Sequence, residues 1–384
     1  KIPHARAGRC QILTRTPRPA MSAPLSESRS PTCLGIPMKW VSLLLLVAQT
    51  VSVVFAMRLS RTVQVDGKRY LNTTAVFFSE IFKLICSFLF LLHEKGGCIS
   101  SSLNIVRQHF FRSPTEALKV AVPGLLYTVQ NNLLFISLSN LSGAVYQVTY
   151  QLKILTTAVL SVMILGKVLG PTKWSALMTL TAGVALIQLP RGSGGGASAN
   201  APAQGSPVVG LVAVLSACLT SGLAGVWLEK ILKQTDASIW LRNIQLAFFG
   251  SVLGLLGAWV QDGSKIRADG LMQGYSTLVW GVILLQAVGG LVVAAVLKYA
   301  DNILKCFGNA CSIVLSCLLS AALLHEFEPD MLFVMGTLLV ILATTLYSIG
   351  VPAPVQALWK DAVAASSPTS KVYAMDGGKM SSAV

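Results

Sequence analysis

The sequence predicts an all-α membrane protein in which ten transmembrane helices form two inverted five-helix repeats. Three observations predict this fold class: 12% of the 384 residues are charged, ten long apolar segments follow one another, and a Gly-rich stretch divides them five and five. Soluble proteins usually carry about 25% charged residues, and a soluble domain this apolar would expose large apolar patches to water. The composition therefore excludes an ordinary soluble domain.

The ten apolar segments are expected to be helices. Each is close to the length of about 20 residues with which a helix crosses a bilayer. Their apolar and polar residues do not alternate as in the strands of a membrane barrel, and a helix satisfies its own backbone groups in lipid. We expect helices at residues 40–57, 72–92, 116–138, 142–164, 172–190, 207–229, 238–260, 275–297, 302–324 and 330–350.

The segments between and around the helices define the domain organisation. We expect a disordered basic N-terminal arm at 1–38, a first five-helix half at 39–190, a linker at 191–206, a second half at 207–350 and a flexible cytosolic tail at 351–384. The arm is rich in Arg, Pro and Ser and has no apolar period, and either Met21 or Met38 is a candidate start. The linker is rich in Gly, Ala and Ser. An odd number of helices per half gives the two halves opposite orientations, as in duplicated transporters.

The distribution of lysine and arginine predicts the orientation. The formal net charge is +15, and cytoplasmic loops of membrane proteins carry an excess of these residues. The arm, the tail and the loop with Arg107 and Arg112 share one side, so we predict that both termini are cytosolic. The chain lacks a basic stripe with interleaved aromatics, so membrane lipid rather than nucleic acid is the expected partner. The sequons at Asn72 and Asn140 lie at helix ends, and their glycosylation stays open.

Two lysines lie in otherwise apolar helices. A charge near the bilayer centre costs about 2.5–3.5 kcal/mol, so each lysine needs a reason. Lys153 has no acidic neighbour in sequence, and Lys305 occupies the comparable place in the second half. Because an ammonium is a natural partner for phosphate, the two lysines predict a clamp for one diphosphate near the midplane. For Lys305, an ion pair with Asp301, four residues earlier, is the alternative.

Other charges in the helices have a local explanation. Glu80 and Lys83 are three residues apart, which places them on one helix face as an ion pair. The sequence leaves open whether this pair is structural or contacts a substrate. Glu229 and Lys230 end the sixth segment, where we expect them to extend to the membrane interface.

Uncharged polar side chains fill the same region of the sequence. They are Tyr127, Gln130, Asn131 and Asn132 in the third segment, Ser221 in the sixth, and Asn243 and Gln245 in the seventh. Alone, each predicts only an interhelical hydrogen bond worth about 0.6 kcal/mol. Together, such amides and hydroxyls are suited to a nucleobase edge, a ribose or a sugar.

These residues belong to runs that resemble the Golgi nucleotide-sugar transporters of the drug/metabolite transporter superfamily. The runs are YTVQNNLL (127–134), YQVTYQLKILTT (146–157), EKILK (229–233), LRNIQL (241–246) and KYADNILK (298–305). The resemblance implies a ten-helix antiporter in the Golgi membrane. Its implied cargo is a cytosolic UDP-sugar, with UDP-N-acetylglucosamine first and UDP-galactose second, exchanged for lumenal UMP.

The resemblance also implies which residues hold the nucleotide. They are Tyr127, Asn131, Lys153, Ser221, Asn243 and Lys305, to which we add Tyr150 in the run before Lys153. Ala247 and Ala294 are implied specificity residues, because related CMP-sialic acid carriers have Tyr and Ser there. Small side chains at both places leave room for a second phosphate and a hexose. The chain departs from the family at Cys306, where a glycine is usual.

Two other classes of function fit the sequence less well. A membrane-embedded enzyme acting on lipid-linked sugars needs a catalytic carboxylate or metal ligands, but the aspartates are scattered and the eight cysteines and four histidines form no metal-binding pattern. A scaffold that transports nothing gains nothing from buried lysines. The sequence therefore predicts no enzyme, catalytic residue, metal or cofactor, and it leaves a homo-oligomer open.

Overall fold

The structure of the chain, a computed structural model, describes residues 32–33, 35–62, 68–112, 114–189, 206–234, 238–324 and 329–349. The predicted N-terminal arm before residue 32, the linker up to residue 205 and the tail lie outside the described residues. The expectations for these three segments therefore stay predictions.

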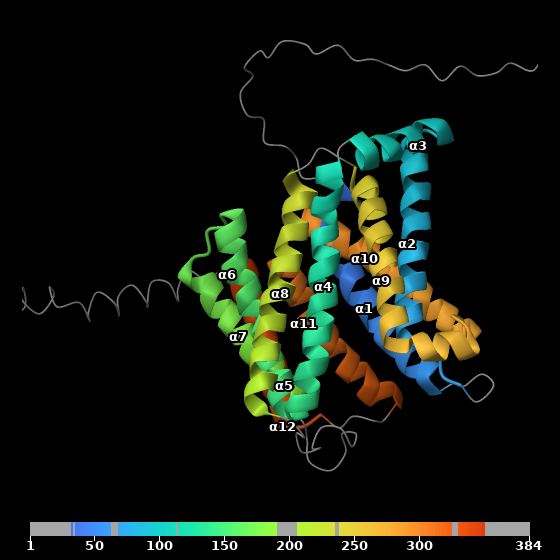
Figure 1. Cartoon of the computed structure of the whole chain (residues 1–384). Helices are drawn as coiled ribbons and strands as arrows, with labels where there is room; N and C mark the ends of the chain where they lie inside the picture. The colour runs from blue at the N-terminus through green and yellow to red at the C-terminus, as the bar shows by residue number, and fades with distance from the viewer. Residues whose placement is uncertain are drawn as a thin grey trace, which may run out of the picture.

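The described residues are almost entirely helical and form a bundle (Figure 1). The helices are α1 (Met38–Thr62), α2 (Asn72–Glu94), α3 (Ile99–Arg107), α4 (Pro114–Asn140), α5 (Gly143–Tyr150), α6 (Lys153–Leu165), α7 (Pro171–Gln188), α8 (Pro207–Gln234), α9 (Ile239–Asp269), α10 (Thr277–Tyr299), α11 (Asn302–Leu319) and α12 (Met331–Ile349). The structure also contains two π-helical turns, Gln108–Arg112 and Ser320–Leu324, and a short antiparallel hairpin of β1 (Thr32–Cys33) and β2 (Ile36–Pro37). The all-α class is confirmed.

Within the described ranges, nine helical segments are long and apolar enough to cross a membrane. They coincide with nine of the ten predicted segments, so the membrane class is confirmed. The remaining segment, α7, has 18 residues and carries Thr172 and Lys173 in its first turn and Gln188 at its end, which lowers its apolarity. The arrangement as two inverted repeats of five helices stays a prediction.

The predicted segment 142–164 is two helices rather than one. Between α5 and α6, the backbone N–H groups of Gln151 and Leu152 donate to the carbonyls three residues earlier, at 3.2 and 3.1 Å. This tighter hydrogen bonding marks a break in an α-helix. The side-chain amide of Gln151 also donates to Gln188 Oε1 of α7 at 2.7 Å. Consequently Lys153 is the first residue of α6, beside a discontinuity of the kind that transporters use at their binding sites.

Glycines set the closest helix contacts in the bundle. A Cβ at Gly183 of α7 would lie 2.9 Å from the carbonyl oxygen of Gly336 in α12, and a Cβ at Gly336 would lie 2.7 Å from the carbonyl oxygen of Gly183. Small residues let helix backbones approach in this way in membranes. Around this crossing, α6, α7, α11 and α12 share one apolar core, which includes Leu180 and Phe307.

The two ends of the bundle are built differently. At one end, Gly96 and Gly97 adopt positive φ values of 67° and 79°, and the chain turns from α2 into α3, which lies across the bundle (Figure 1). At the other end, the aromatic rings of Tyr70, Phe78, Tyr275 and Trp280 pack edge to face. Burial raises the pKa of Tyr275 to about 12, so its hydroxyl stays protonated and forms a 2.9 Å hydrogen bond with Thr74.

Candidate functional site

A cavity of about 710 Å³ lies between α2, α4, α9 and α10, with the start of α11 at its wall. This volume falls in the range of about 300–1,000 Å³ that is typical of small-molecule sites. The lining includes Asn72 and Thr73 at the start of α2 and Leu138 near the end of α4. Because α2 runs from there toward α3, the cavity extends to the end of the bundle opposite α3.

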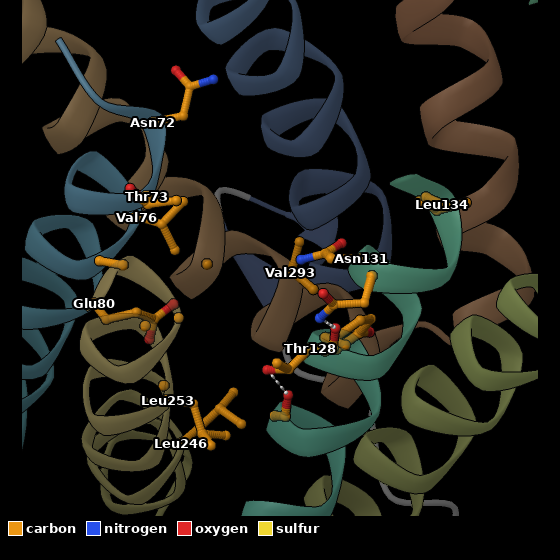
Figure 2. Close-up of a pocket in the computed structure, with 18 of the residues that line it drawn as sticks. Asn72, Thr73, Val76, Glu80, Thr128, Asn131, Leu134, Leu246, Leu253 and Val293 are labelled. Atoms are coloured by element: carbon orange, nitrogen blue, oxygen red, sulfur yellow. Dashed lines mark hydrogen bonds between the residues drawn. The ribbon is translucent and has the colours of Figure 1, made fainter. Parts of the chain in front are cut away.

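Four of the nine predicted site residues line this cavity: Tyr127 and Asn131 of α4, Ala294 of α10 and Lys305 of α11. Figure 2 shows Asn131 on α4 across the cavity from Glu80 on α2. Polar α4 neighbours bond to their own helix, since Thr128 Oγ1 donates to the Gly124 carbonyl at 3.0 Å and Asn132 Nδ2 donates to the Thr128 carbonyl at 2.9 Å. The structure thus brings residues from both predicted halves to one cavity.

Lys153 and Tyr150 lie behind the cavity wall. The ammonium of Lys153 is 4.0 Å from the centre of the Tyr150 ring, a cation–π contact. The Tyr150 hydroxyl accepts a hydrogen bond from Gln130 Nε2 at 2.9 Å, and Ser221 lies close to the same hydroxyl. The Tyr150 ring stacks on Tyr146, with centroids 5.8 Å apart, and Tyr146 lines the cavity. Through Tyr146, three further predicted residues, Tyr150, Lys153 and Ser221, are thus linked to the cavity.

The two lysines carry positive charge into this region without an ion-pair partner among the described residues. The alternative pairing of Lys305 with Asp301 is wrong. Asp301 Oδ1 instead accepts the backbone N–H of Leu304 at 2.7 Å, which caps α11, and Asp301 Oδ2 lies 3.7 Å from Lys167 Nζ.

Asn243 of α9 is buried, with 1% of its surface exposed. Neither its amide oxygen nor its amide nitrogen has a hydrogen-bond partner in the described part of the chain. A buried polar group without a partner costs about 1–3 kcal/mol, so the amide is poised for a group that the protein does not supply. Ala247, one turn later, is fully buried, while Leu246 beside it lines the cavity.

The predicted ion pair of Glu80 and Lys83 is confirmed, with a 2.5 Å separation, and both residues line the cavity. Two glycines make room for it. A Cβ at Gly250 of α9 would lie 2.6 Å from the Glu80 carboxylate, and one at Gly290 of α10 would lie 2.7 Å from Lys83 Cδ. The pair is therefore enclosed between α2, α9 and α10.

Sequence reasoning missed a stripe of glycines in α9. Gly250, Gly254 and Gly257 all line the cavity. Their spacing of four and three residues places them on one helix face, which is visible in the sequence as GSVLGLLG. This pattern marks the helix face that gives the cavity its width.

Contacts near α3 hold together the end of the bundle that lies opposite the end to which the cavity extends. The rings of Phe90 in α2 and Trp240 in α9 stack with centroids 4.4 Å apart. Ser238, before α9, donates to the Glu94 carboxylate at the end of α2 at 2.5 Å. Trp227 of α8 donates from Nε1 to the Lys119 carbonyl of α4 at 3.0 Å. The cavity is thus bounded by packed helices on the α3 side.

Comparison with known proteins identifies the family of the chain. The family described as nucleotide-sugar transporter matches residues 35–348. The UDP-N-acetylglucosamine transporter of Mus musculus is 51% identical over 311 residues, covering 81% of this chain and 95% of that protein. The UDP-galactose translocator of Bos taurus is 44% identical over 351 residues, covering 91% and 86%. A crystal structure of a protein 14% identical in sequence shares the fold, with a TM-score of 0.57 over 81% of this chain and 98% of that one. The chain belongs to the nucleotide-sugar transporter family.

Proposed function

We propose that the protein is an antiporter of the Golgi membrane that carries UDP-N-acetylglucosamine from the cytosol into the lumen in exchange for UMP. Both termini are cytosolic in this proposal. Relatives named UDP-N-acetylglucosamine transporter, 50–51% identical, support the cargo. They are named as transporters rather than as enzymes.

The observation that carries the proposal is the pair of lysines without carboxylate partners. Lys305 lines the cavity, and Lys153 lies near it behind Tyr146 and Tyr150. In a site shielded from water, an ammonium is stabilised by an anion, and lysine binds phosphate as a point charge. A nucleoside diphosphate sugar supplies the negative charge that this part of the protein lacks.

Uncharged groups account for the rest of the substrate. The unpartnered amide of Asn243 offers both a donor and an acceptor, which suits the edge of a uracil ring. Ala294 lines the cavity with a small side chain and leaves room for a hexose. Ala247 is fully buried, so a tyrosine at that position would have to displace its neighbours.

A second cargo, UDP-galactose, is favoured by one observation. The bovine UDP-galactose translocator is 44% identical over 91% of this chain. Discrimination between two sugars by pocket shape is worth only about 1–3 kcal/mol per contact. We therefore expect partial transport of UDP-galactose beside UDP-N-acetylglucosamine.

The shape of the cavity supports one step of the exchange. The cavity extends to the end opposite α3, while stacked and hydrogen-bonded residues join α2 to α9 at the α3 end. If the loop with Arg107 is cytosolic, this conformation has its cavity toward the lumen. A lumen-facing cavity is the form that releases the sugar nucleotide and accepts UMP.

Competition for uptake tests the proposed cargo. The full chain is reconstituted in vesicles, and uptake of labelled UDP-N-acetylglucosamine is measured with unlabelled UMP, CMP or UDP-galactose outside. We expect UMP to compete at concentrations at which CMP does not, and UDP-galactose to compete weakly. Equal competition by CMP and UMP would contradict the assignment of the base. Stronger uptake of UDP-galactose would contradict only the assignment of the sugar.

A further inference from the structure

Glu229 of α8 is a carboxylate with no exposed surface. The expectation that it extends to the membrane interface is wrong, because it is enclosed by partners from three segments. Lys167 Nζ, in the loop after α6, and Lys233 Nζ, one turn later in α8, each lie 2.8 Å from Glu229 Oε1. The other oxygen, Oε2, accepts the backbone N–H of Asn302 at 3.0 Å.

These contacts attach α8 to the N-terminus of α11. Asn302 is the first residue of α11, and its N–H is one of the groups that a helix leaves without an internal partner. Negative charge at a helix N-terminus is stabilised by the helix dipole. Lys233 adds a second attachment, because its ammonium donates to the Ala300 carbonyl, just before α11, at 2.6 Å.

The packing around Asn302 is close. Gly225 lies one turn before Glu229 in α8, and a Cβ at that position would come 2.8 Å from the Asn302 amide oxygen. Asn302 itself has 2% of its surface exposed. The Glu229 carboxylate thus holds the start of α11 on α8, and Gly225, which has no side chain, allows the two helices to approach this closely.

The four charges in this cluster balance one another. The Glu229 cluster comprises Lys167, Glu229, Lys233 and Asp301, with Lys167 bridging Glu229 and Asp301. Its two ammonium groups and two carboxylates sum to zero. Asp301 therefore contacts Lys167 of the cluster and caps α11, and it does not neutralise the charge of Lys305.

Lys305 follows directly from this anchored helix start. Its backbone N–H donates to the Asp301 carbonyl at 3.0 Å, in the first turn of α11, and its side chain lines the cavity. We propose that Glu229 is a positioning residue for the substrate site: by holding the N-terminus of α11 on α8, it fixes the place from which Lys305 reaches the substrate phosphates. This inference rests on the proposed role of Lys305 in binding phosphate.

The test compares a ligand that has a phosphate with one that lacks it. Equilibrium binding of UMP and of uridine to the purified full chain is measured for Glu229→Gln. A displaced Lys305 should weaken UMP binding about tenfold and leave uridine binding unchanged. Glu229→Asp, which keeps the charge, should retain more UMP affinity than Glu229→Gln. The matched control is Asp269→Asn, because Asp269 also pairs with a lysine, Lys68, but lies at the end of α9 and outside the cavity lining; it should change neither affinity.

A second variant perturbs the same helix start by another route. Gly225→Ala pushes on the Asn302 side chain without removing a charge, and should also weaken UMP more than uridine. If Glu229→Gln does not fold, Gly225→Ala still tests the positioning role. In the Lys305→Ala background, either change should cost little further UMP affinity, since its effect acts through Lys305.

The outcomes separate this inference from the proposed function. If Lys305→Ala weakens UMP binding but Glu229→Gln and Gly225→Ala do not, or if they weaken uridine equally, the positioning role is overturned and the phosphate role of Lys305 stands. If Lys305→Ala itself leaves UMP binding unchanged, the proposed phosphate site fails and the inference fails with it.

Discussion

At the scale of single residues, the candidate site is defined by groups whose partners the protein does not supply. Lys305 lines the cavity, the ammonium of Lys153 lies over the Tyr150 ring, and the buried amide of Asn243 has no hydrogen bond to the described residues. Each of these groups carries a desolvation cost that a bound nucleotide would offset. In the proposed function, these groups are therefore expected to contact the nucleotide.

Removal of either lysine should abolish most of the exchange. A hydrogen bond to a charged group contributes about 1.5–3 kcal/mol, so Lys305→Ala and Lys153→Ala should each weaken UMP binding by at least about tenfold. Lys298→Ala is the control, because Lys298 lies in the last turn of α10, outside the cavity lining. Exchange rates of reconstituted variants, normalised to folded protein, provide the measurement. Near-normal exchange by either of the first two variants would contradict the phosphate clamp.

The ion pair on the cavity wall leads to a prediction with a control in the same helix. Gly250→Ala places a methyl group 2.6 Å from the Glu80 carboxylate, whereas the added Cβ at Gly263, also in α9 but outside the cavity lining, makes only an ordinary contact of 3.5 Å with the Trp259 ring. We expect Gly250→Ala to displace Glu80 and Lys83 and to reduce transport severalfold, while Gly263→Ala leaves transport nearly unchanged. Uptake assays of the two variants check this. Equal effects would show that the Glu80 and Lys83 pair has no part in transport.

At the scale of helices, the break between α5 and α6 sets the positions of two predicted site residues. It places Lys153 at the first residue of a helix and Tyr150 at the last residue of the preceding one. Hydropathy does not reveal the break, because Ile154 and the residues that follow are as apolar as those of a continuous helix. The tight turn is instead fixed by the contact of Gln151 with Gln188, a residue of another helix.

The crossing of α7 and α12 supplies a stability prediction. Gly183→Ala adds a methyl group against the Gly336 backbone, and overpacking of this kind costs typically about 1–3 kcal/mol. Gly281→Ala in α10 is the matched control, since nothing lies within 4 Å of its added Cβ. Thermal unfolding in detergent should show a lower midpoint for Gly183→Ala only. A midpoint at or above that of the unmodified protein would show that the two helices are not in contact as described.

At the scale of the whole molecule, the fold class followed from local properties of the sequence. Length and apolarity decide whether a segment crosses a membrane, so the membrane helices could be predicted one by one. Lys153 and Lys305 could be singled out as candidate site residues because a charge in an apolar helix is costly. The Glu229 cluster could not be predicted, because Lys167 and Asp301 are distant from Glu229 in the sequence. The stacking of Tyr146 on Tyr150 was likewise missed, since it depends on where α5 ends.

The orientation of the molecule is predicted by its basic residues. We expect a protease added to intact Golgi vesicles to remove an epitope from the C-terminal tail and to leave an epitope inserted in the linker (191–206) protected. Disruption of the vesicles with detergent is the control, and it should expose both epitopes. Protection of the tail in intact vesicles would contradict the predicted cytosolic termini.

The most direct test of the central claim is exchange across a membrane. Vesicles that contain the purified full chain are loaded with UMP, CMP or buffer, and the initial uptake of labelled UDP-N-acetylglucosamine is measured. An antiporter that uses Lys153 and Lys305 for phosphates should take up the label fastest in UMP-loaded vesicles, and Lys305→Ala should remove that stimulation. Uptake that is equal in all three vesicle preparations, or UMP stimulation that survives in Lys305→Ala, would contradict the account.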